Sequence, residues 1–261
     1  MTQFPIFLIN LDSSTERLSI ASAALEKQGA QFTRIPAYDG RRTNPADVPE
    51  YSSAKTRAYM GRDLNGGEVG CFFSHIFAAQ AFLETDAEYG LVLEDDISPT
   101  PSAIALTQSL IDWQSQKGAP DWQLCNLGNP RMKYLTWAGE IHAKEEQRTI
   151  FRAHYFPMTT TALLWTRQGA QAFIDTCTPI DCPVDHFMRR WFTRTDMGIA
   201  VQKPVFETTL AQSEIDISGL QKRRETSERS PLYGWLKAKR MYGDKIRATC
   251  HKIRWALAPK H

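Results

Sequence analysis

The sequence predicts an α/β fold, a sheet flanked by helices, that continues into a basic amphipathic helical tail. Three observations support this fold class. Apolar runs typical of buried strands, such as those at residues 4–11 and 89–93, alternate with segments of helical periodicity. The length of 261 residues and the hydrophobic content of 42% suffice for a full core. Charge is distributed unevenly, which divides the chain into a body at residues 1–220 and a tail at residues 221–261.

The N-terminal part of the body predicts a β-α-β opening of the kind that builds parallel sheets. The expected elements are a strand at residues 4–11, a helix at 13–28, a strand at 31–37 and a helix at 68–85. Between the last two lies a polar, proline-containing loop of about 25 residues, and loops of that length in compact domains are usually functional. We expect it to act as a lid or an acceptor loop.

The second part of the body predicts further alternation of strands and helices. The expected elements are a strand up to residue 93, a helix at 102–116, strands at 122–127 and 158–166, helices at 168–177 and 184–193, and a strand near 199–203. Residues 128–157 combine Gly, Pro and mixed charge, and we expect them to form an irregular excursion over one edge of the sheet.

The strand that begins at Tyr89 ends in three consecutive carboxylates, Glu94, Asp95 and Asp96. In open α/β sheets the ligand crevice lies outside the carboxyl ends of the strands. Because side chains alternate along a strand, Glu94 and Asp96 point to one side and Asp95 to the other. We therefore expect Glu94 and Asp96 to hold a divalent cation against a phosphate-bearing ligand. The alternative is that the acids only cap a turn before Pro99.

The five cysteines are odd in number and lack paired C-x-x-C spacing, which favours free thiols in a reducing compartment. The first eleven residues have no basic leader, so we interpret them as a core strand and not as a secretory signal. No segment reaches the length of a membrane span. These observations predict a cytoplasmic protein.

The tail is basic and the body acidic. Residues 221–261 hold 12 Lys/Arg and 3 Asp/Glu, a balance of +9, whereas the other residues, with 19 and 26, have a balance of −7. Apolar residues recur in the tail at helical intervals with Lys and Arg between them, which predicts a basic amphipathic helix. Its apolar stripe either packs on the body or lies in an anionic membrane interface, and the sequence leaves both interpretations open. We expect no nucleic-acid partner.

Six short segments appear in an order and at spacings that point to one family. They are I-F-L-I-N-L-D-S-S-T-E-R from Ile6, A-Y-D-G from Ala37, G-E-V-G-C-F-F-S-H from Gly67, L-V-L-E-D-D from Leu91, T-R-Q-G-A from Thr166 and P-V-D from Pro183. Together they resemble glycosyltransferase family 25, which contains bacterial lipooligosaccharide galactosyltransferases and collagen-modifying relatives. The resemblance spans roughly residues 4–217.

The resemblance implies a GT-A type, nucleotide-sugar-binding, Rossmann-like mixed sheet and transfer of a hexose with inversion at the anomeric carbon. UDP-galactose is the usual donor of the bacterial members, and a lipid-linked oligosaccharide is the implied acceptor. Mn²⁺ or Mg²⁺ held by Glu94 and Asp96 would stabilise the charge on departing UDP. Many GT-A enzymes carry Asp-x-Asp at this point; here the first position is Glu94, which leaves open which two acids bind the metal.

On the donor side, the resemblance favours a phosphate contact for Arg17, which is otherwise an ordinary surface residue. Asp39 could accept hydrogen bonds from the ribose or the uracil, or it could form an Asp-Gly turn with Gly40. Asn10 and Asp95, each at a strand end, complete the expected donor contacts.

Gly67 lies at the start of the helix at residues 68–85, where free N–H groups suit an anion. Glu68 and His75 share one face of that helix, so we expect Glu68 to hold a sugar hydroxyl or to orient His75. For His75 itself the alternatives are a contact to the sugar and a satisfied core histidine.

An inverting transfer needs a base that removes the acceptor proton. Asp185 is our candidate because it matches the family's P-V-D segment. The alternatives are that it is an N-cap, that it contacts the sugar or the metal, or that Asp181 is the base. Gln212 and Ser213 resemble a late segment of the family that closes over the donor.

Two other functions remain open. A metal-dependent nucleotidyltransferase usually has a Gly-rich, basic loop after the first strand, and residues 10–14 have neither property. A non-catalytic protein that binds glycans or nucleotides would be free to lose its carboxylates. This chain retains them, which argues against a non-catalytic function. We therefore expect a UDP-sugar-dependent glycosyltransferase whose tail contacts the inner face of the cytoplasmic membrane peripherally.

Overall fold

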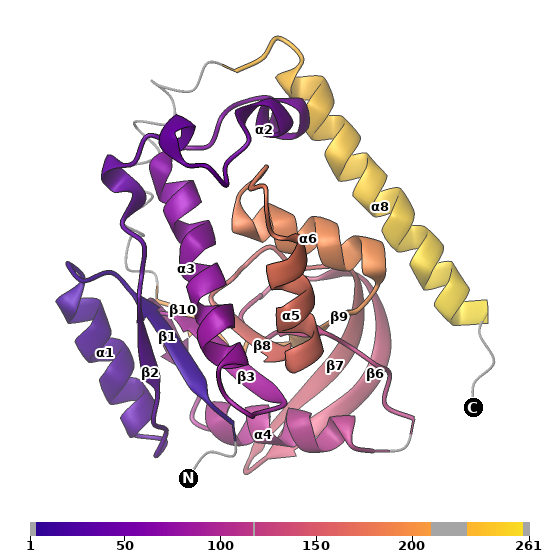
Figure 1. The fold of residues 1–261 in the computed structure, drawn as a ribbon. Helices are drawn as coiled ribbons and strands as arrows, with labels where there is room; N and C mark the ends of the chain where they lie inside the picture. Colours follow the sequence, from indigo (N-terminus) through magenta and orange to yellow (C-terminus); the bar gives the residue numbers. More distant parts are fainter. Residues whose placement is uncertain (1–3, 117, 210–228, 258–261) are drawn as a thin grey trace.

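The computed structural model describes residues 4–116, 118–209 and 229–257, and it has the mixed α/β architecture that the sequence predicts (Figure 1). Eight strands form the central sheet in the order β2-β1-β3-β8-β5-β9-β7-β6, and β10 pairs with β4 in a second, two-stranded sheet. The strands are β1 (Ile6–Asn10), β2 (Thr33–Pro36), β3 (Tyr89–Glu94), β4 (Ile97–Pro99), β5 (Leu124–Asn126), β6 (Lys133–Ala143), β7 (Glu146–Tyr155), β8 (Ala162–Thr166), β9 (Gly198–Gln202) and β10 (Phe206–Thr208).

The sheet is parallel where the β-α-β opening was expected. Strand β1 lies between β2 and β3 and is parallel to both. Strand β8 is antiparallel to its two neighbours, β3 and β5, and β7 is antiparallel to β9. The carboxyl ends of β1, β2 and β3 therefore meet at one edge of the sheet, where Asn10, Asp39 and the three carboxylates lie.

Helices cover both faces of the sheet. The helices are α1 (Thr15–Glu26), α2 (Ser53–Met60), α3 (Gly66–Leu83), α4 (Ala103–Gln114), α5 (Arg167–Thr176), α6 (Val184–Thr195) and α8 (Tyr233–Leu257), with short 3₁₀ turns η1 (Gly40–Arg42) and η2 (Pro45–Asp47). One core cluster joins α3, α5 and α6 to one face, and a second joins α1 and α4 to the other.

Side chains along β1 and β3 point alternately to the two faces of the sheet, so successive residues pack in different clusters. In β3, Val92 packs in the α3 cluster, whereas Leu91 and Leu93 pack in the α1 cluster. Both faces are buried, which explains why these strands appear in the sequence as unbroken apolar runs.

The prediction for residues 128–157 is wrong. They contain the long hairpin of β6 and β7. Its turn takes a left-handed φ of 53° at Lys144, where Gly or Asn would be the usual hairpin signal in a sequence. Strand β6 lies at the edge of the sheet and only two of its eleven residues are buried, so the apolar pattern that marks a strand is weak.

The loop expected between β2 and α3 also contains regular structure. Helix α2 occupies eight of its residues, begins with Ser52 accepting a hydrogen bond from the Lys55 N–H, and ends at Gly61 in the left-handed conformation. The segment is thus not an open loop, and its role as a lid or acceptor loop stays a prediction.

The tail forms helix α8, as predicted, and one face of the helix packs on the body. Trp255 Nε1 donates to Asp196 Oδ2 at 2.8 Å, and the Arg152 guanidinium lies 5.0 Å from the centre of the Trp255 ring. Arg240 donates to the carbonyl of Tyr59 in α2. Figure 1 shows α8 running along α2 and past the end of α6.

The other face of α8 is exposed and apolar. Its exposed large apolar side chains, together with Leu232 directly before the helix, form what we call the α8 stripe: Leu232, Trp235, Tyr242, Ile246, Ile253 and Leu257. Within the described residues, no helix has the length and apolar character needed to cross a membrane. The predicted boundary at residue 220 lies outside the described residues.

Candidate active site

The carboxylates that follow β3 separate to two sides. Asp95 points toward α1: its Oδ2 accepts from Asn10 Nδ2 at 2.7 Å, and its Oδ1 lies 2.5 Å from Arg17 Nη2. Glu94 points toward α3: its Oε1 lies 3.1 Å from His75 Nε2 and accepts from Thr160 Oγ1 at 2.6 Å. The alternation inferred from the sequence accounts for this division.

Asp96 carries an oxygen without a partner. Its Oδ1 is buried and, within the described chain, makes no hydrogen bond, and its Oδ2 lies 3.9 Å from Arg17 Nη2. Burial and then the negative charge of Glu94 raise the pKa of Asp96 to about 6. An unsatisfied carboxylate oxygen beside a second carboxylate suits a hard divalent cation such as Mn²⁺ or Mg²⁺, so the residues present fit such an ion.

Glu94 itself is held in its ionised form. Burial would raise its pKa, but the hydrogen bond and the charge of His75 outweigh that effect, and the pKa of Glu94 lies below its ordinary value. Because an ionised carboxylate only accepts hydrogen bonds, His75 Nε2 carries the hydrogen that it shares with Glu94.

Asn10 and Arg17 position Asp95. The Asn10 side chain is buried and uses both ends within the protein: its Nδ2 donates to Asp95, and its Oδ1 accepts from Arg34 Nε at 3.0 Å. Arg17 differs, because its Nε is buried with no hydrogen-bond partner in the described chain. A donor left unsatisfied at this edge is suited to an incoming anion.

Asp39 forms the turn that the sequence suggested. It is the N-cap of η1 and accepts from the Arg41 backbone N–H at 3.1 Å and from Arg41 Nη2 at 2.6 Å. These hydrogen bonds from Arg41 hold the pKa of Asp39 at about 2. The carboxylate is 47% exposed, which leaves room for a ligand; its contact to the donor stays a prediction.

Three glycines bring the Asp39 turn into backbone contact with α3. A Cβ on Gly40 would lie within 3.0 Å of the Gly66 carbonyl oxygen, one on Gly66 within 3.0 Å of the Gly40 oxygen, and one on Gly70 at 2.5 Å from the Tyr38 oxygen. We call this contact the glycine seam. Gly67, the candidate from the sequence, is not part of it: its Cβ would meet only Asn65 Oδ1, at 3.3 Å.

The described contacts of Glu68 are to Asn65 and Arg62 and give no support to its expected role in orienting His75, while its contact to a sugar hydroxyl stays a prediction. Glu68 closes a capping box with Asn65, whose Oδ1 accepts from the Glu68 N–H at 2.8 Å, and it pairs with Arg62 at 2.6 Å. The partner of His75 is Glu94, and His75 Nδ1 is buried without a hydrogen bond to any described residue. Asn65 three residues before Glu68 was the signal for this capping role.

Asp185 lies in the first turn of α6, two residues after the N-cap Pro183, so the N-cap interpretation is wrong. Burial raises its pKa to about 6, opposed by the hydrogen bond from the His186 N–H and reinforced by the charges of Glu68 and Glu94. The competing acid, Asp181, is held by both Nη atoms of Arg190 at 2.7 Å. Gln212 and Ser213 lie outside the described residues.

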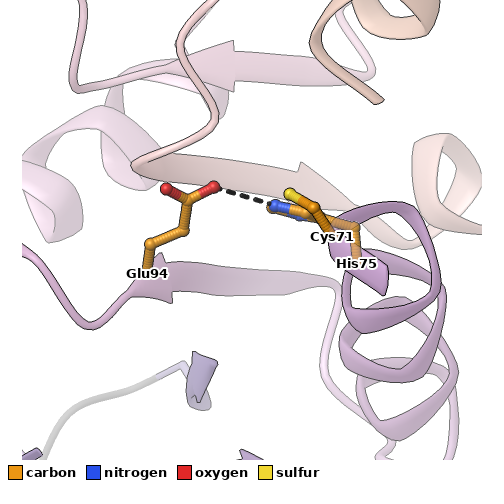
Figure 2. Close-up of side chains that lie close together, drawn as sticks. All are labelled: Cys71, His75 and Glu94. Atoms are coloured by element: carbon orange, nitrogen blue, oxygen red, sulfur yellow. Dashed lines mark hydrogen bonds and ion pairs between the residues drawn. The ribbon is translucent and has the colours of Figure 1, made fainter. Parts of the chain in front are cut away.

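Sequence reasoning missed Cys71. Its Sγ, a ring nitrogen of His75 and an oxygen of Glu94 lie within 4.8 Å of one another. Figure 2 shows the three side chains gathered together. Cys71 and His75 are four residues apart on α3 and point from the same face toward the end of β3. That spacing was visible in the sequence, but the facing Glu94 comes from another element.

Comparison with known proteins identifies one family. The family model described as "Glycosyltransferase family 25 (LPS biosynthesis protein)" matches residues 3–188. Human "Procollagen galactosyltransferase 2" is 28% identical over 132 residues, which is 49% of this chain and 21% of that protein. "Procollagen galactosyltransferase 1-B" of Xenopus laevis is 32% identical over 133 residues, 49% of this chain and 21% of that protein.

A "Glycosyltransferase 25 family member" of Drosophila pseudoobscura pseudoobscura is 27% identical over 197 residues, 72% of this chain and 30% of that protein. The chain thus spans between about a fifth and a third of the length of these relatives. Among solved structures, a glycosyltransferase involved in glycosylation of the major capsid of PBCV-1 overlaps 84% of this chain and 98% of its own, with a TM-score of 0.39 and 10% identity.

Proposed function

The chain belongs to glycosyltransferase family 25, and we propose that it is an inverting enzyme that transfers a hexose, with galactose as the first candidate, from a UDP-sugar to a lipooligosaccharide or related surface glycan. The observation that carries the proposal is the buried, unpartnered Asp96 Oδ1 beside Glu94 at the carboxyl end of β3. The names of the relatives support galactose as the sugar. The mixed sheet would then be a nucleotide-sugar-binding sheet of the GT-A type.

On this proposal, the donor pyrophosphate lies between Glu94 and Asp96 on one side and Arg17 on the other. A bound Mn²⁺ or Mg²⁺ would be held by Glu94 and Asp96 and would supply positive charge that favours departure of UDP. Arg17 contributes its unsatisfied Nε as a donor to a phosphate oxygen. Asn10 and Asp95 hold the Arg17 guanidinium in place. Asp39 lies half exposed after β2, where it can accept from the ribose or the uracil.

Asp185 would remove the proton from the attacking hydroxyl of the acceptor. With a pKa of about 6 it is ionised at neutral pH and still basic enough to take the proton as the bond forms. Asp181 is less suited to this role because Arg190 holds both of its oxygens.

The pH dependence of transfer tests this assignment. A base must be ionised, so kcat/KM should be constant above neutral pH and should fall as the pH drops through about 6. The assays contain saturating Mn²⁺, so that protonation of Asp96, whose pKa is also about 6, does not contribute to the fall in kcat/KM. Asp185→Asn should lower kcat by about 10² to 10⁴ and flatten the acid limb, whereas Asp181→Asn should keep the limb. An unchanged limb in Asp185→Asn would show that another group is the base.

Release of UDP tests the proposed function directly. UDP-galactose, UDP-glucose and UDP-N-acetylglucosamine are each incubated with the protein in Mn²⁺ or in EDTA, because slow donor hydrolysis does not need the acceptor. Manganese-dependent release from one donor would establish the reaction class and the sugar. If no donor is hydrolysed and none binds in the presence of metal, the second candidate, a non-catalytic protein that binds glycans, is favoured.

The exposed face of α8 supports a peripheral contact with the inner face of the cytoplasmic membrane. The α8 stripe is apolar, and the exposed Lys237, Lys239, Arg247, Lys252 and Arg254 lie on the same helix. A helix with an apolar face and Lys/Arg beside it binds the interface of an anionic bilayer. That position would bring the enzyme to a lipid-linked acceptor.

The membrane contact predicts a specific loss of vesicle binding. In the variant Trp235→Ser with Ile246→Ser, affinity for phosphatidylglycerol vesicles should fall about tenfold or more, because two exposed apolar side chains are lost. Binding of UDP should not change. Ile20→Ser is the matched control, since Ile20 is 53% exposed on α1, outside the stripe. Equal vesicle binding by both variants in a sedimentation assay would exclude the stripe from a membrane contact.

A further inference from the structure

We propose that Cys71, His75 and Glu94 form a binding site for Zn²⁺ that shares Glu94 with the proposed Mn²⁺ site and takes its other two ligands from α3. The three side chains come from two elements that face each other, α3 and the end of β3 (Figure 2). One sulfur, one nitrogen and one oxygen atom lie within 4.8 Å of one another, and the nitrogen and oxygen are 3.1 Å apart. Ligand atoms around a tetrahedral zinc are roughly 3.5 Å apart, so small rotations of the side chains would close the site.

The chemistry of the donor set selects the metal. A thiolate, an imidazole and one carboxylate oxygen are a zinc set, whereas Mn²⁺ and Mg²⁺ prefer oxygen ligands only. Three protein ligands leave a fourth tetrahedral position for water. Binding would release two protons to solvent, one from the Cys71 thiol and one from His75 Nε2, and would leave His75 as a neutral imidazole ligand.

A contact from outside the three side chains would fix the Glu94 carboxylate as a ligand. Thr160 Oγ1, which donates to Glu94 at 2.6 Å, would orient that ligand.

Because Glu94 belongs to both sets, Zn²⁺ and Mn²⁺ would compete for it. This consequence rests on the proposed function: zinc should inhibit transfer, and Mn²⁺ should relieve the inhibition. The binding itself does not rest on it and is measured without donor or acceptor, so the two proposals can fail separately.

The test uses Co²⁺ as a spectroscopic substitute for zinc in the metal-free protein of 261 residues. Coordination by Cys71 should give thiolate-to-cobalt charge-transfer absorption in the near ultraviolet, which Zn²⁺ should abolish by displacing cobalt. Cys71→Ser should lack the absorption and bind Zn²⁺ at least about tenfold more weakly. Loss of a residue that hydrogen-bonds to a metal ligand already lowers metal affinity by about tenfold or more, and loss of the ligand itself should lower it at least as much. Cys250→Ser, which removes an exposed thiol on α8, is the control and should retain it.

A second measurement needs no variant. In the unmodified protein, Zn²⁺ should slow alkylation of Cys71 by iodoacetamide, followed by mass spectrometry of its peptide, and should leave alkylation of Cys250 unchanged. Charge-transfer absorption that persists in Cys71→Ser, or equal alkylation of Cys71 with and without zinc, would overturn the proposal.

Discussion

Asp96→Asn is expected to lower kcat by about 10² to 10³ or more and to remove the metal-dependent part of UDP binding. Asparagine keeps the size of the side chain but loses the negative charge that a divalent cation requires. Asp96 Oδ1 is buried with no hydrogen bond to a described residue, so little of the fold depends on that oxygen. The measurement is a pair of UDP titrations by calorimetry, one in Mn²⁺ and one in EDTA, together with the initial rate of UDP release.

Asp86→Asn is the matched control for this substitution. Asp86 is an exposed acid that precedes β3, at the end of the strand away from the three carboxylates. It should bind UDP and turn over like the unsubstituted protein. If Asp96→Asn retains metal-dependent UDP binding, Asp96 is not a metal ligand, and the cation must be sought at Glu94 with other partners.

Gly66→Ala is expected to lower the free energy of unfolding by about 3 kcal/mol or more, because its Cβ would overlap backbone and not a flexible side chain. The overlapping atoms are the carbonyl oxygens of Gly40 and Thr43, which belong to the turn after β2. Relief would require that turn to move away from α3, which would break the glycine seam. Urea denaturation followed by circular dichroism measures the loss.

The neighbouring residue supplies the control for the seam. Gly67→Ala adds the same methyl group one position later in the same helix, where the nearest atom is Asn65 Oδ1 at 3.3 Å. Its stability should remain within about 1 kcal/mol of the unsubstituted protein, since alanine also favours the helix. If Gly66→Ala and Gly67→Ala have the same free energy of unfolding, the turn at Gly40 can move away from α3 without loss of stability. The glycine seam would then not stabilise the fold.

The strands at the centre of the sheet were predictable because both of their faces are buried. Strands β1 and β3 appear as continuous apolar runs, and α5 and α6 each have one apolar face at helical spacing. The hairpin of β6 and β7 was missed because its turn depends on a lysine in the left-handed conformation, which no composition rule marks. Local pattern therefore identified the buried central strands and the edge strand β2, and it failed at the hairpin of β6 and β7.

For the site, alternation correctly divided Glu94 from Asp95, because it depends only on strand geometry. The partners of these acids were not predictable, since they come from elements far away in the chain. Asn10 and Asp95 are joined by the pairing of β1 with β3, and Glu94 meets His75 through the packing of α3 on the sheet. The role of Glu68 in orienting His75 was inferred only from the helix face that the two residues share. The inference left out Asn65, the capping partner of Glu68.

Helix α6 connects the proposed base to the proposed membrane contact. Asp185 lies in its first turn, and Asp196, which ends it, accepts the hydrogen bond from Trp255 of α8. Twelve helical residues span about 18 Å. If the α8 stripe rests on a bilayer, this rigid connection sets the height of Asp185 above the lipid surface. An acceptor would then react only if the number of sugars between its lipid and its attacking hydroxyl matches that height. The enzyme would therefore be selective for glycan length as well as for the terminal sugar.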